Sequence, residues 1–199
     1  ITFDAQILTA LPSVVYNVSN QGTISGTNFD TVLTNDGSGA WDTPTIITID
    51  GQLSYKFTMA SGISLDWNWN GKADPGDGIK YVISFENDGT HDMSSVILRD
   101  TPDPNTRLVV GTVTTTSGHV KSGNRLGDEK IEIDIGTVGA LNGKFTVTFV
   151  VTVVDPFPGN VQFVSNQAFL DATTYIPENG KPGRIHLVSS DASTTIVDD

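Results

Sequence analysis

The sequence of 199 residues contains no cysteine, which excludes disulfides, thiol chemistry and thiolate metal sites. Stability must therefore come from packing or from bound ions. No apolar run approaches the roughly 18 to 20 residues that cross a membrane. The chain also starts at Ile1 without the basic region and apolar stretch of a signal peptide. We therefore expect a mature or excised soluble product with no membrane insertion.

Basic residues are scarce as well. Eleven Lys and Arg against 23 Asp and Glu give a formal net charge of -12, which repels phosphate backbones and anionic lipid. We therefore expect no nucleic-acid partner. Lysine, glutamate, alanine and leucine are sparse, whereas threonine, valine, glycine, serine and aspartate are abundant. This balance favours strands and tight turns over helices. It is common among secreted β proteins, so we expect an extracellular or cell-surface location.

Alternation of apolar and polar residues is the strongest pattern in the sequence. It places the apolar residues of 79–87 and of 130–136 on one face each, as in half-buried strands. In 144–154 valines and threonines fill the other face too, which predicts a central strand. Further runs bounded by Gly, Pro, Asn and Asp predict strands at 53–60, 94–100, 108–116, 161–172 and 184–190. Because no window carries a helical stripe, we predict an all-β fold, an antiparallel immunoglobulin-like β-sandwich.

A repeat divides the chain into two parts. The tetrapeptide Val-Ser-Asn-Gln begins at Val18 and returns at Val164, 146 residues later. The stretch "TPTIITID" near residue 50 also sits where "ASTTIVDD" closes the chain. We therefore predict a partial repeat or strand-donating segment at 1–50 and a complete β-sandwich repeat domain at 51–199.

The partial repeat raises the question of what completes it. The last strands of a sandwich cannot bury their own apolar face, and their edges leave backbone groups unpaired. Residues 51–199 of the same chain could complete them, or a neighbouring copy could do so by strand addition, including donor-strand exchange. The segment could also be a piece cut from a longer tandem array. In each case the expected partners are copies of the chain or neighbouring repeats.

The stretch "DWNWNGKADPGD" at 66–77 matches the spacing of a calcium loop, with Gly71 at the sixth position for the sharp turn. Asp77 replaces the usual glutamate at position twelve, so the loop would be pulled in or use a water molecule. The expected calcium ligands are Asp66, Asn68, Asn70, the Lys72 carbonyl, Asp74 and Asp77. Because strands flank the loop, we expect a clamp rather than a sensor, one that rigidifies the joint between 1–50 and 51–199.

Other interpretations of this loop remain open. It could be a bare turn in which Asx and Gly residues serve only turn chemistry. A glycosidase would need two carboxyl groups about 5 to 9.5 Å apart across a cleft, which a tight loop does not offer. His91, His119 and His186 show no zinc-type spacing, and no nucleophile elbow or phosphate-binding glycine loop is present. We therefore expect no enzymatic activity.

Trp67 and Trp69 alternate within the loop, so they could form a platform for a sugar ring or a partner subunit. Alternatively they close the end of the sandwich over its core. The platform supports a second hypothesis, a carbohydrate-binding or adhesion module. Asn17 opens the sequon Asn-Val-Ser, a candidate glycosylation site on an exported chain.

The loop and the strand after it are similar to a known family. After Pro75-Gly76-Asp77 the sequence reads Ile79, Tyr81, Ile83, Phe85, Asn87 and Gly89, followed later by Asp100 and Pro102. A second match, in the stretch 160–172, carries Val164, Asn166 and Ala168. These motifs resemble the conserved repeat domain, called domain of unknown function eleven, of bacterial and archaeal surface proteins.

This resemblance covers most of 63–199, and 1–50 resembles the end of a preceding copy. Trp67, Trp69 and Asn70 depart from the family's loop pattern. The resemblance implies an immunoglobulin-like sandwich with a scaffolding role in cell-surface, S-layer-associated or filament proteins, and no catalytic activity.

Overall fold

The computed structural model describes residues 2–7, 17–38, 42–49 and 51–197. Parts of the predicted partial repeat, residues 1, 8–16, 39–41 and 50, therefore lie outside the described residues. Across the described ranges every element is a strand except one short 3-10 helix, η1 (Pro177–Asn179). The predicted all-β fold is confirmed. In the same ranges, no helix is long and apolar enough to cross a membrane.

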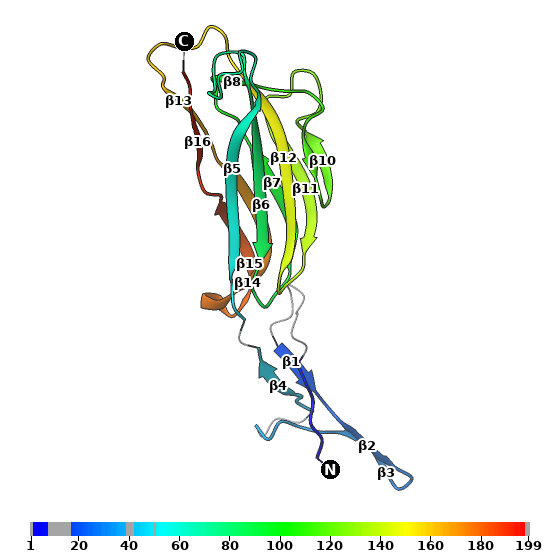
Figure 1. Cartoon of the computed structure of the whole chain (residues 1–199). Coiled ribbons are helices and arrows are strands. Elements are labelled where there is room, and N and C mark those ends of the chain that lie inside the picture. Colours follow the sequence, from blue (N-terminus) through cyan, green and yellow to red (C-terminus); the bar gives the residue numbers. More distant parts are fainter. Residues whose placement is uncertain (1, 8–16, 39–41, 50, 198–199) are drawn as a thin grey trace.

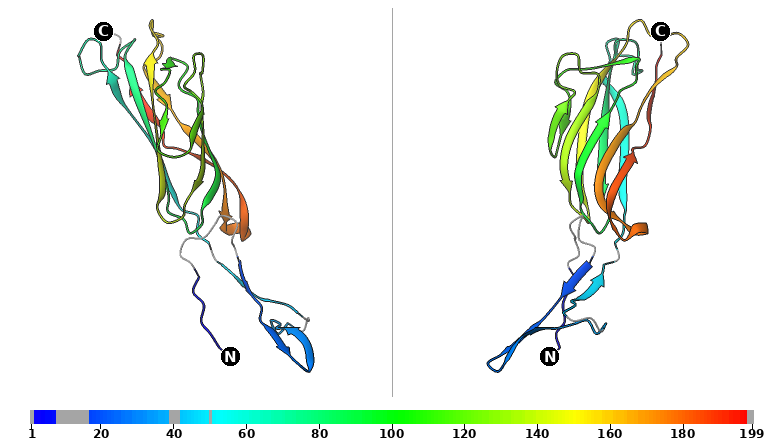
Figure 2. Two further views of the ribbon diagram at one scale, coloured as in Figure 1. Left: turned by 90° about the vertical axis from the view of Figure 1, so that its right-hand side faces the viewer. Right: turned by 180° about the vertical axis from the view of Figure 1, so that it is seen from behind.

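Two antiparallel sheets pack face to face (Figures 1 and 2). The first contains, in spatial order, β10 (His119–Ser122), β11 (Ile131–Val138), β7 (Met93–Asp100), β14 (Ala168–Ile176) and β15 (Lys181–Val188). The second contains β5 (Tyr55–Leu65), β6 (Gly78–Asn87), β12 (Gly143–Val153) and β8 (Thr106–Leu108), with β9 (Thr114–Thr115) also paired to β12. This arrangement is the predicted immunoglobulin-like sandwich.

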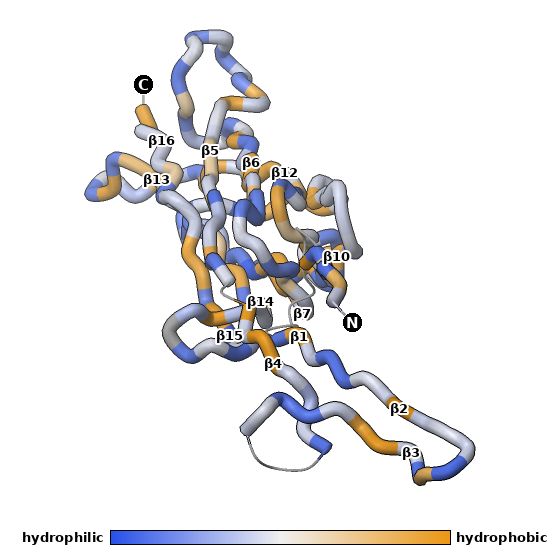
Figure 3. Tube along the Cα trace, turned by 90° about the horizontal axis from the view of Figure 1, so that it is seen from below, coloured by the Kyte–Doolittle hydropathy of each residue, from blue (hydrophilic) through white to orange (hydrophobic). Residues whose placement is uncertain are grey.

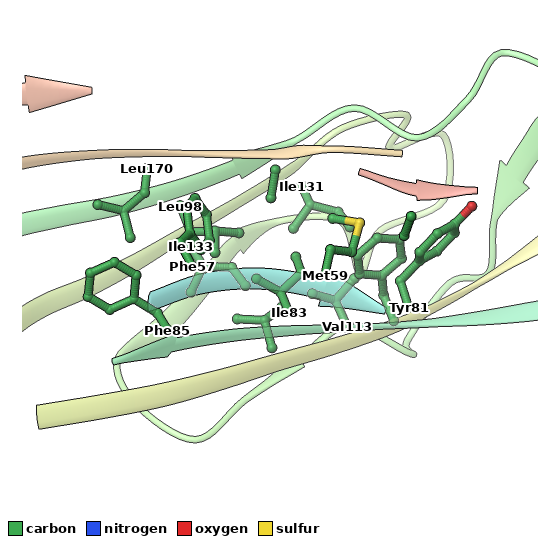
Figure 4. Packing of buried hydrophobic residues seen from close by; sticks show 14 of the residues in the cluster. Phe57, Met59, Tyr81, Ile83, Phe85, Leu98, Val113, Ile131, Ile133 and Leu170 are labelled. Atoms are coloured by element: carbon green, nitrogen blue, oxygen red, sulfur yellow. The ribbon is translucent and has the colours of Figure 1, made fainter. Parts of the chain in front are cut away.

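The core follows the alternation in the sequence. The apolar residues of β6 point inward, and Ile83 and Phe85 face Leu98, Ile133 and Leu170 of the opposite sheet (Figure 4). All five side chains are buried, and each contributes about 1.5 to 3 kcal/mol by leaving water. Strand β12 pairs with β6 on one side and with β8 and β9 on the other, so its predicted central place is confirmed.

Two predicted strands are divided in the structure. The run 108–116 breaks at Gly111, which has a φ of 81°, and Thr112 turns its hydroxyl back to the Val109 carbonyl oxygen at 2.7 Å. The run 161–172 breaks at Gln167, between β13 (Phe163–Asn166) and β14. Strand β13 pairs with β16 (Ala192–Thr195) beside β5, whereas β14 joins the first sheet. Apolar alternation continues through both breaks, so it does not reveal them.

Residues 17–49 form four short strands outside the sandwich, at the end where β5 begins (Figure 1). Strand β1 (Asn17–Asn20) pairs with β4 (Thr45–Thr48), and β2 (Thr23–Gly26) pairs with β3 (Phe29–Leu33). Every side chain in these four strands is exposed. Figure 3 shows apolar residues along β3 and β4. We call residues 17–49 the N-terminal module.

The connection from the N-terminal module to β5 is anchored on the sandwich. The backbone N–H of Gln52 donates to the Thr90 hydroxyl at 2.8 Å, and the Thr90 N–H donates to the Gln52 carbonyl at 3.0 Å. Gly51 lies against the stacked rings of His91 and Tyr175, where an added Cβ would come within 2.3 Å of the Tyr175 ring. Only glycine fits this close approach without a shift of the rings.

Candidate functional site

The predicted calcium loop joins β5 to β6 and is fixed to two other strands. The Gly76 N–H donates to the Val153 carbonyl at 3.0 Å, and the Val153 N–H donates to the Asp77 carbonyl at 2.9 Å. On its other side, Ala73 accepts the Val197 N–H at 2.9 Å and forms an isolated bridge with Ile196. The loop therefore ties β12 to the chain that follows β16.

The position of the loop differs from the expectation that it rigidifies the joint between 1–50 and 51–199. The loop follows the last residue of β5, whereas the N-terminal module joins the first residue of β5 through 51–54. The two lie at opposite ends of an 11-residue strand. Within one chain, therefore, the loop does not rigidify the joint between 1–50 and 51–199.

Two carboxylates close the loop through backbone hydrogen bonds. Asp77 is buried and accepts the Trp67 N–H on one oxygen and the Asp74 N–H on the other, both at 3.0 Å. Asp66 accepts the Gly71 N–H at 2.8 Å. Gly71 has a φ of 77°, so the sharp turn at the sixth position requires glycine, as the template predicts.

Two amide side chains converge on Asp74. The Nδ2 atoms of Asn68 and Asn70 both donate to Oδ2 of Asp74 at 2.8 Å. Their Oδ1 atoms accept the backbone N–H groups of Asn70 and Lys72, at 3.1 and 2.7 Å. The structure thus gathers Asn68, Asn70 and Asp74 around one point, as the spacing predicts, and holds Lys72 next to them.

The loop also contains carboxylate oxygens without partners. Asp74 is buried, and Oδ1 of Asp74 and Oδ1 of Asp66 are both inaccessible to solvent and have no hydrogen-bond partner in the part of the chain that the structure describes. A buried oxygen left unpaired costs about 1 to 3 kcal/mol, more when it is charged. A hard cation is one group that would satisfy such atoms.

The ligand set would have to be mixed. Within the described ranges, no three His, Cys, Asp or Glu side chains are grouped to hold one ion. A cation here would need amide and backbone carbonyl oxygens in addition to carboxylates, which are ligands that calcium accepts. Turning the amides of Asn68 and Asn70 by half a rotation would present oxygen in place of nitrogen to the centre of the loop, at the cost of the backbone N–H bonds that their Oδ1 atoms accept.

The two loop tryptophans are exposed, 69% for Trp67 and 89% for Trp69. They therefore do not close the sandwich over its core. Trp69 has a φ of 58°, an uncommon conformation for a residue other than glycine. Together with Ile63 and Leu65 of β5 it lines a shallow hollow. These side chains are available to a partner.

Sequence reasoning missed one buried polar pair. Asn166 of β13 donates Nδ2 to both carboxylate oxygens of Asp100, at the end of β7, each at 3.0 Å. Burial raises the pKa of Asp100 to about 7, although the hydrogen bond from Asn166 opposes that shift. Oδ1 of Asn166 is buried and has no partner. The signal that could have found the pair is the presence of Asn166 in the repeated tetrapeptide.

The repeated tetrapeptide marks the same structural corner twice. In β1 and β4, Val18 is opposite Ile47; in β13 and β16, Val164 is opposite Thr194. We call residues 163–196 the C-terminal module. Its strand order, β13 paired with β16 and β14 paired with β15, matches β1 with β4 and β2 with β3.

The corner that follows the tetrapeptide has the same hydrogen bonds in both modules. Gln21 donates Nε2 to the Thr34 carbonyl at 3.0 Å, and Gln167 donates Nε2 to the Ser189 carbonyl at 3.1 Å. The next residue donates its N–H to the hydroxyl of the same Thr34 or Ser189, at 2.7 and 3.0 Å. Two segments of one chain therefore have equivalent local structures.

The two modules differ in what covers them. Val164 and Leu170 of the C-terminal module are fully buried in the sandwich core. The residues at the same places in the N-terminal module, Val18 and Ile24, are 42% and 58% exposed. The N-terminal module thus has the strands of the C-terminal module without the surface that covers them.

The remaining candidate residues do not form a site together. Asn17 is the exposed first residue of β1, where a glycan could attach. His91 is buried against Tyr175, whereas His119 is exposed on β10. Nδ1 of His186 lies 2.7 Å from Asp171 on the surface. The histidines are therefore separate from one another, as their spacing predicts.

Comparisons with known proteins concern the fold. No family model matches the sequence, and no curated protein matches it. A major pilin subunit of Bacillus cereus, BcpA, is 11% identical over 91% of this chain and 56% of its own, with a TM-score of 0.43. The full-length major pilin SpaD of Corynebacterium diphtheriae is 14% identical over 80% of this chain and 39% of its own, with a TM-score of 0.45.

An exo-β-N-acetylglucosaminidase of Vibrio harveyi is also similar, at 16% identity over 73% of this chain and 18% of its own, with a TM-score of 0.37. The chain thus spans between 18% and 56% of the length of these three structures. Likenesses at this level carry no argument about activity.

Proposed function

We propose that this chain is an extracellular structural module of a cell-surface or filament protein, with no enzymatic activity. It works mechanically, through β-sheet contacts with copies of itself or with neighbouring repeats, and calcium in the loop at 66–77 rigidifies it. The proposal includes membership of the surface-protein repeat family that the motifs around Pro75 and Asn166 resemble.

One observation carries the assembly part of the proposal. The N-terminal module has four ordered strands whose side chains are all exposed, including Val18, Ile24 and Ile47. Isolated two-stranded sheets are marginal in water, and unpaired edges recruit further strands. A neighbouring β surface that covers this module would stabilise it and would link two units at the same time.

The calcium part rests on the geometry of the loop. Asp66 and Asp74 each carry a buried oxygen without a partner, and the amides of Asn68 and Asn70 already surround Asp74. Calcium would supply the missing partner and tie the loop more firmly to β12 and to the chain after β16. In a domain without disulfides, a ligand at a hundredfold excess over Kd adds about 2.7 kcal/mol to the free energy of unfolding.

A second candidate function is a carbohydrate-binding or adhesion module. The observation that favours it is the exposure of Trp67 and Trp69 beside the hollow lined by Ile63 and Leu65. Exposed aromatic rings stack on sugar rings and on partner side chains. Binding of a glycan that is lost in Trp67→Ala and Trp69→Ala variants would favour this candidate.

Sedimentation velocity over a range of protein concentrations, with calcium and with a chelator, tests the proposed function. We expect a mass that rises with concentration and rises further with calcium. A monomer at every concentration in both conditions would contradict the assembly part. Assembly that is the same in chelator would remove calcium from the proposal.

A further inference from the structure

We propose that the N-terminal module of one chain docks on a second copy of this chain, where it displaces that copy's own C-terminal module from the surface of β5 and β7. We call this surface the acceptor. The inference rests on the proposed function and deepens it, because it names the partner surface and the register. It follows from the equivalence of the two modules around the repeated tetrapeptide, which places residues of β1, β2 and β4 at positions of β13, β14 and β16.

The C-terminal module is held to the acceptor by the backbone pairing of β14 with β7 and by further polar contacts, of which four involve side chains of β13, β16, Ser190 or their partners. Asn166 bonds Asp100 as described above, and the Ser165 N–H donates to Oδ2 of Asp103 at 3.0 Å. Two contacts reach β5: the Ser190 hydroxyl accepts the Met59 N–H at 2.9 Å, and the Ser61 and Thr194 hydroxyls lie 2.8 Å apart. These contacts define a register, because each joins one position of the module to one position of the acceptor.

The N-terminal module has a counterpart for two of these four contacts. Asn20, at the place of Asn166, keeps the amide that would bond Asp100 of the second copy. Ser19, at the place of Ser165, keeps the N–H for Asp103 of the second copy. Ile47 stands at the place of Thr194, so it would lie against Ser61 of the second copy.

The apolar contacts transfer as well. Val18 repeats Val164, and Ile24 stands where Leu170 stands, so both would enter the sandwich core with side chains of the same or nearly the same volume. Swaps that conserve volume usually cost less than about 1.5 kcal/mol. Burying Val18 and Ile24 would contribute roughly 1.5 to 3 kcal/mol each.

The acceptor of the same chain is out of reach for this module. Thr194 lies beside Ser61 of β5. Ile196 follows Thr194 by two residues, so it lies about two residues further along β5, level with Ile63. Ile49, at the place of Ile196, would have to lie there, roughly 26 Å along β5 from Tyr55 at about 3.3 Å per residue. The six residue-to-residue steps from Ile49 to Tyr55 span at most about 22 Å. The acceptor of the same chain is therefore excluded, and the acceptor of a second copy offers the matching register.

The contact has a defined geometry. In the second copy the loop at 66–77 lies beside Ile196. After docking, the same loop would lie beside Ile49 of the first copy. Ile49 comes just before 51–54, the segment anchored on the sandwich of the first copy. The loop at 66–77 of one copy then contacts the end of the neighbouring copy's sandwich where β5 begins. Such a contact joins two different surfaces and makes open head-to-tail chains rather than closed dimers.

Cysteine pairs test the register, because the chain has no cysteine of its own. The donor is the full chain with Ile47→Cys, and the recipient is the full chain with Ser61→Cys and Asn166→Asp. Asn166→Asp sets a second carboxylate against buried Asp100 and loosens the recipient's own C-terminal module. The two are refolded together and oxidised, and covalent dimers are measured on non-reducing gels.

Three further variants are run in parallel. Ser61→Cys with Thr194→Cys in one chain is the positive control, since those hydroxyls lie 2.8 Å apart. Ile46→Cys is the matched donor control, because its counterpart Ser193 is exposed on the other face of β16. A recipient with Ser61→Cys alone, refolded with excess donor, covers the case in which Asn166→Asp prevents folding.

We expect at least tenfold more dimer with the Ile47→Cys donor than with the Ile46→Cys donor, and a loss of that excess when Asn20→Asp is added to the donor. If neither recipient gives more dimer than the Ile46→Cys control while the positive control forms its disulfide, the inference is wrong. Self-association retained without this cross-link would overturn the inference alone, whereas a monomer under all conditions would overturn the proposed function as well.

Discussion

Asn166 donates its side-chain amide to both oxygens of Asp100 at 3.0 Å, and this pair joins β13 to β7 in the interior of the sandwich. Among the described residues the aspartate has no cationic partner, and burial raises its pKa to about 7. Burial therefore favours protonated Asp100 in the folded protein, against the hydrogen bond from Asn166. Asp100 should therefore contribute to the pH dependence of stability.

The expected direction follows from the two pKa values. In the unfolded chain the carboxyl group has its ordinary pKa of 3.8, below the folded value of about 7. The folded state then binds more protons between those values, so the free energy of unfolding falls as pH rises from about 4 to 7. Above pH 7 the full penalty, of order 4 kcal/mol, is present.

Asp100→Asn should remove that penalty, because an amide of the same shape can still accept the Asn166 bond and carries no charge. We expect the variant to gain several degrees in Tm at pH 8 and much less at pH 5. Calorimetric melts at the two pH values measure this difference. An equal shift at both would show that Asp100 is not the titrating group.

Calcium should raise the melting temperature of the chain. A gain of about 2.7 kcal/mol at a hundredfold excess over Kd, at roughly 2 to 4 °C per kcal/mol for a domain of this size, predicts an increase of about 5 to 10 °C. Asp74→Asn should abolish the increase, since Asp74 lies at the centre of the loop. Asp128→Asn is the matched control, because Asp128 caps a different turn through the N–H groups of Gly123 and Arg125. An unchanged melt in chelator would remove calcium from the account.

Matched valine substitutions should separate the two modules. Val164→Ala removes two methyl groups from a fully buried position and should cost about 2 kcal/mol of unfolding free energy. Val18→Ala changes an exposed position of the same repeat and should stay within about 0.5 kcal/mol in dilute monomer. Chemical denaturation of both variants checks the contrast. Equal losses would mean that Val18 is already covered within one chain.

Removing the loop tryptophans should leave the fold intact. Trp67→Ala and Trp69→Ala change exposed side chains, so we expect free energies of unfolding within about 0.5 kcal/mol of the parent chain. The same variants are then screened for glycan binding. A large loss of stability would contradict their exposure in the structure, and a loss of glycan binding with the fold intact would favour the second candidate function.

Much of the fold could be predicted from the sequence. Alternation in 79–87 identifies the inward face of β6, because one sheet face must be buried and the other can be solvated. The break at Gln167 could not be predicted from alternation. It depends on a bond from Gln167 to Ser189, 22 positions later, and hydrophobic periodicity carries no signal for such a contact.

The candidate site was predicted in part. Spacing alone groups Asn68, Asn70 and Asp74, because ligand positions in a tight loop are set by local turn geometry. The pairing of Asp100 with Asn166 could not be predicted, since the two are 66 residues apart and meet only when β13 packs beside β7. The repeated tetrapeptide indicated that Asn166 matters without giving its partner.

The most direct test of the central claim, that this chain is an assembling structural module, is electron microscopy of the purified chain, refolded at high concentration with calcium and with a chelator. The account predicts head-to-tail chains of units with an axial spacing of about 40 Å, set by strands of 11 residues, and shorter or fewer chains in chelator. Single, unconnected particles at every concentration in both conditions would contradict it.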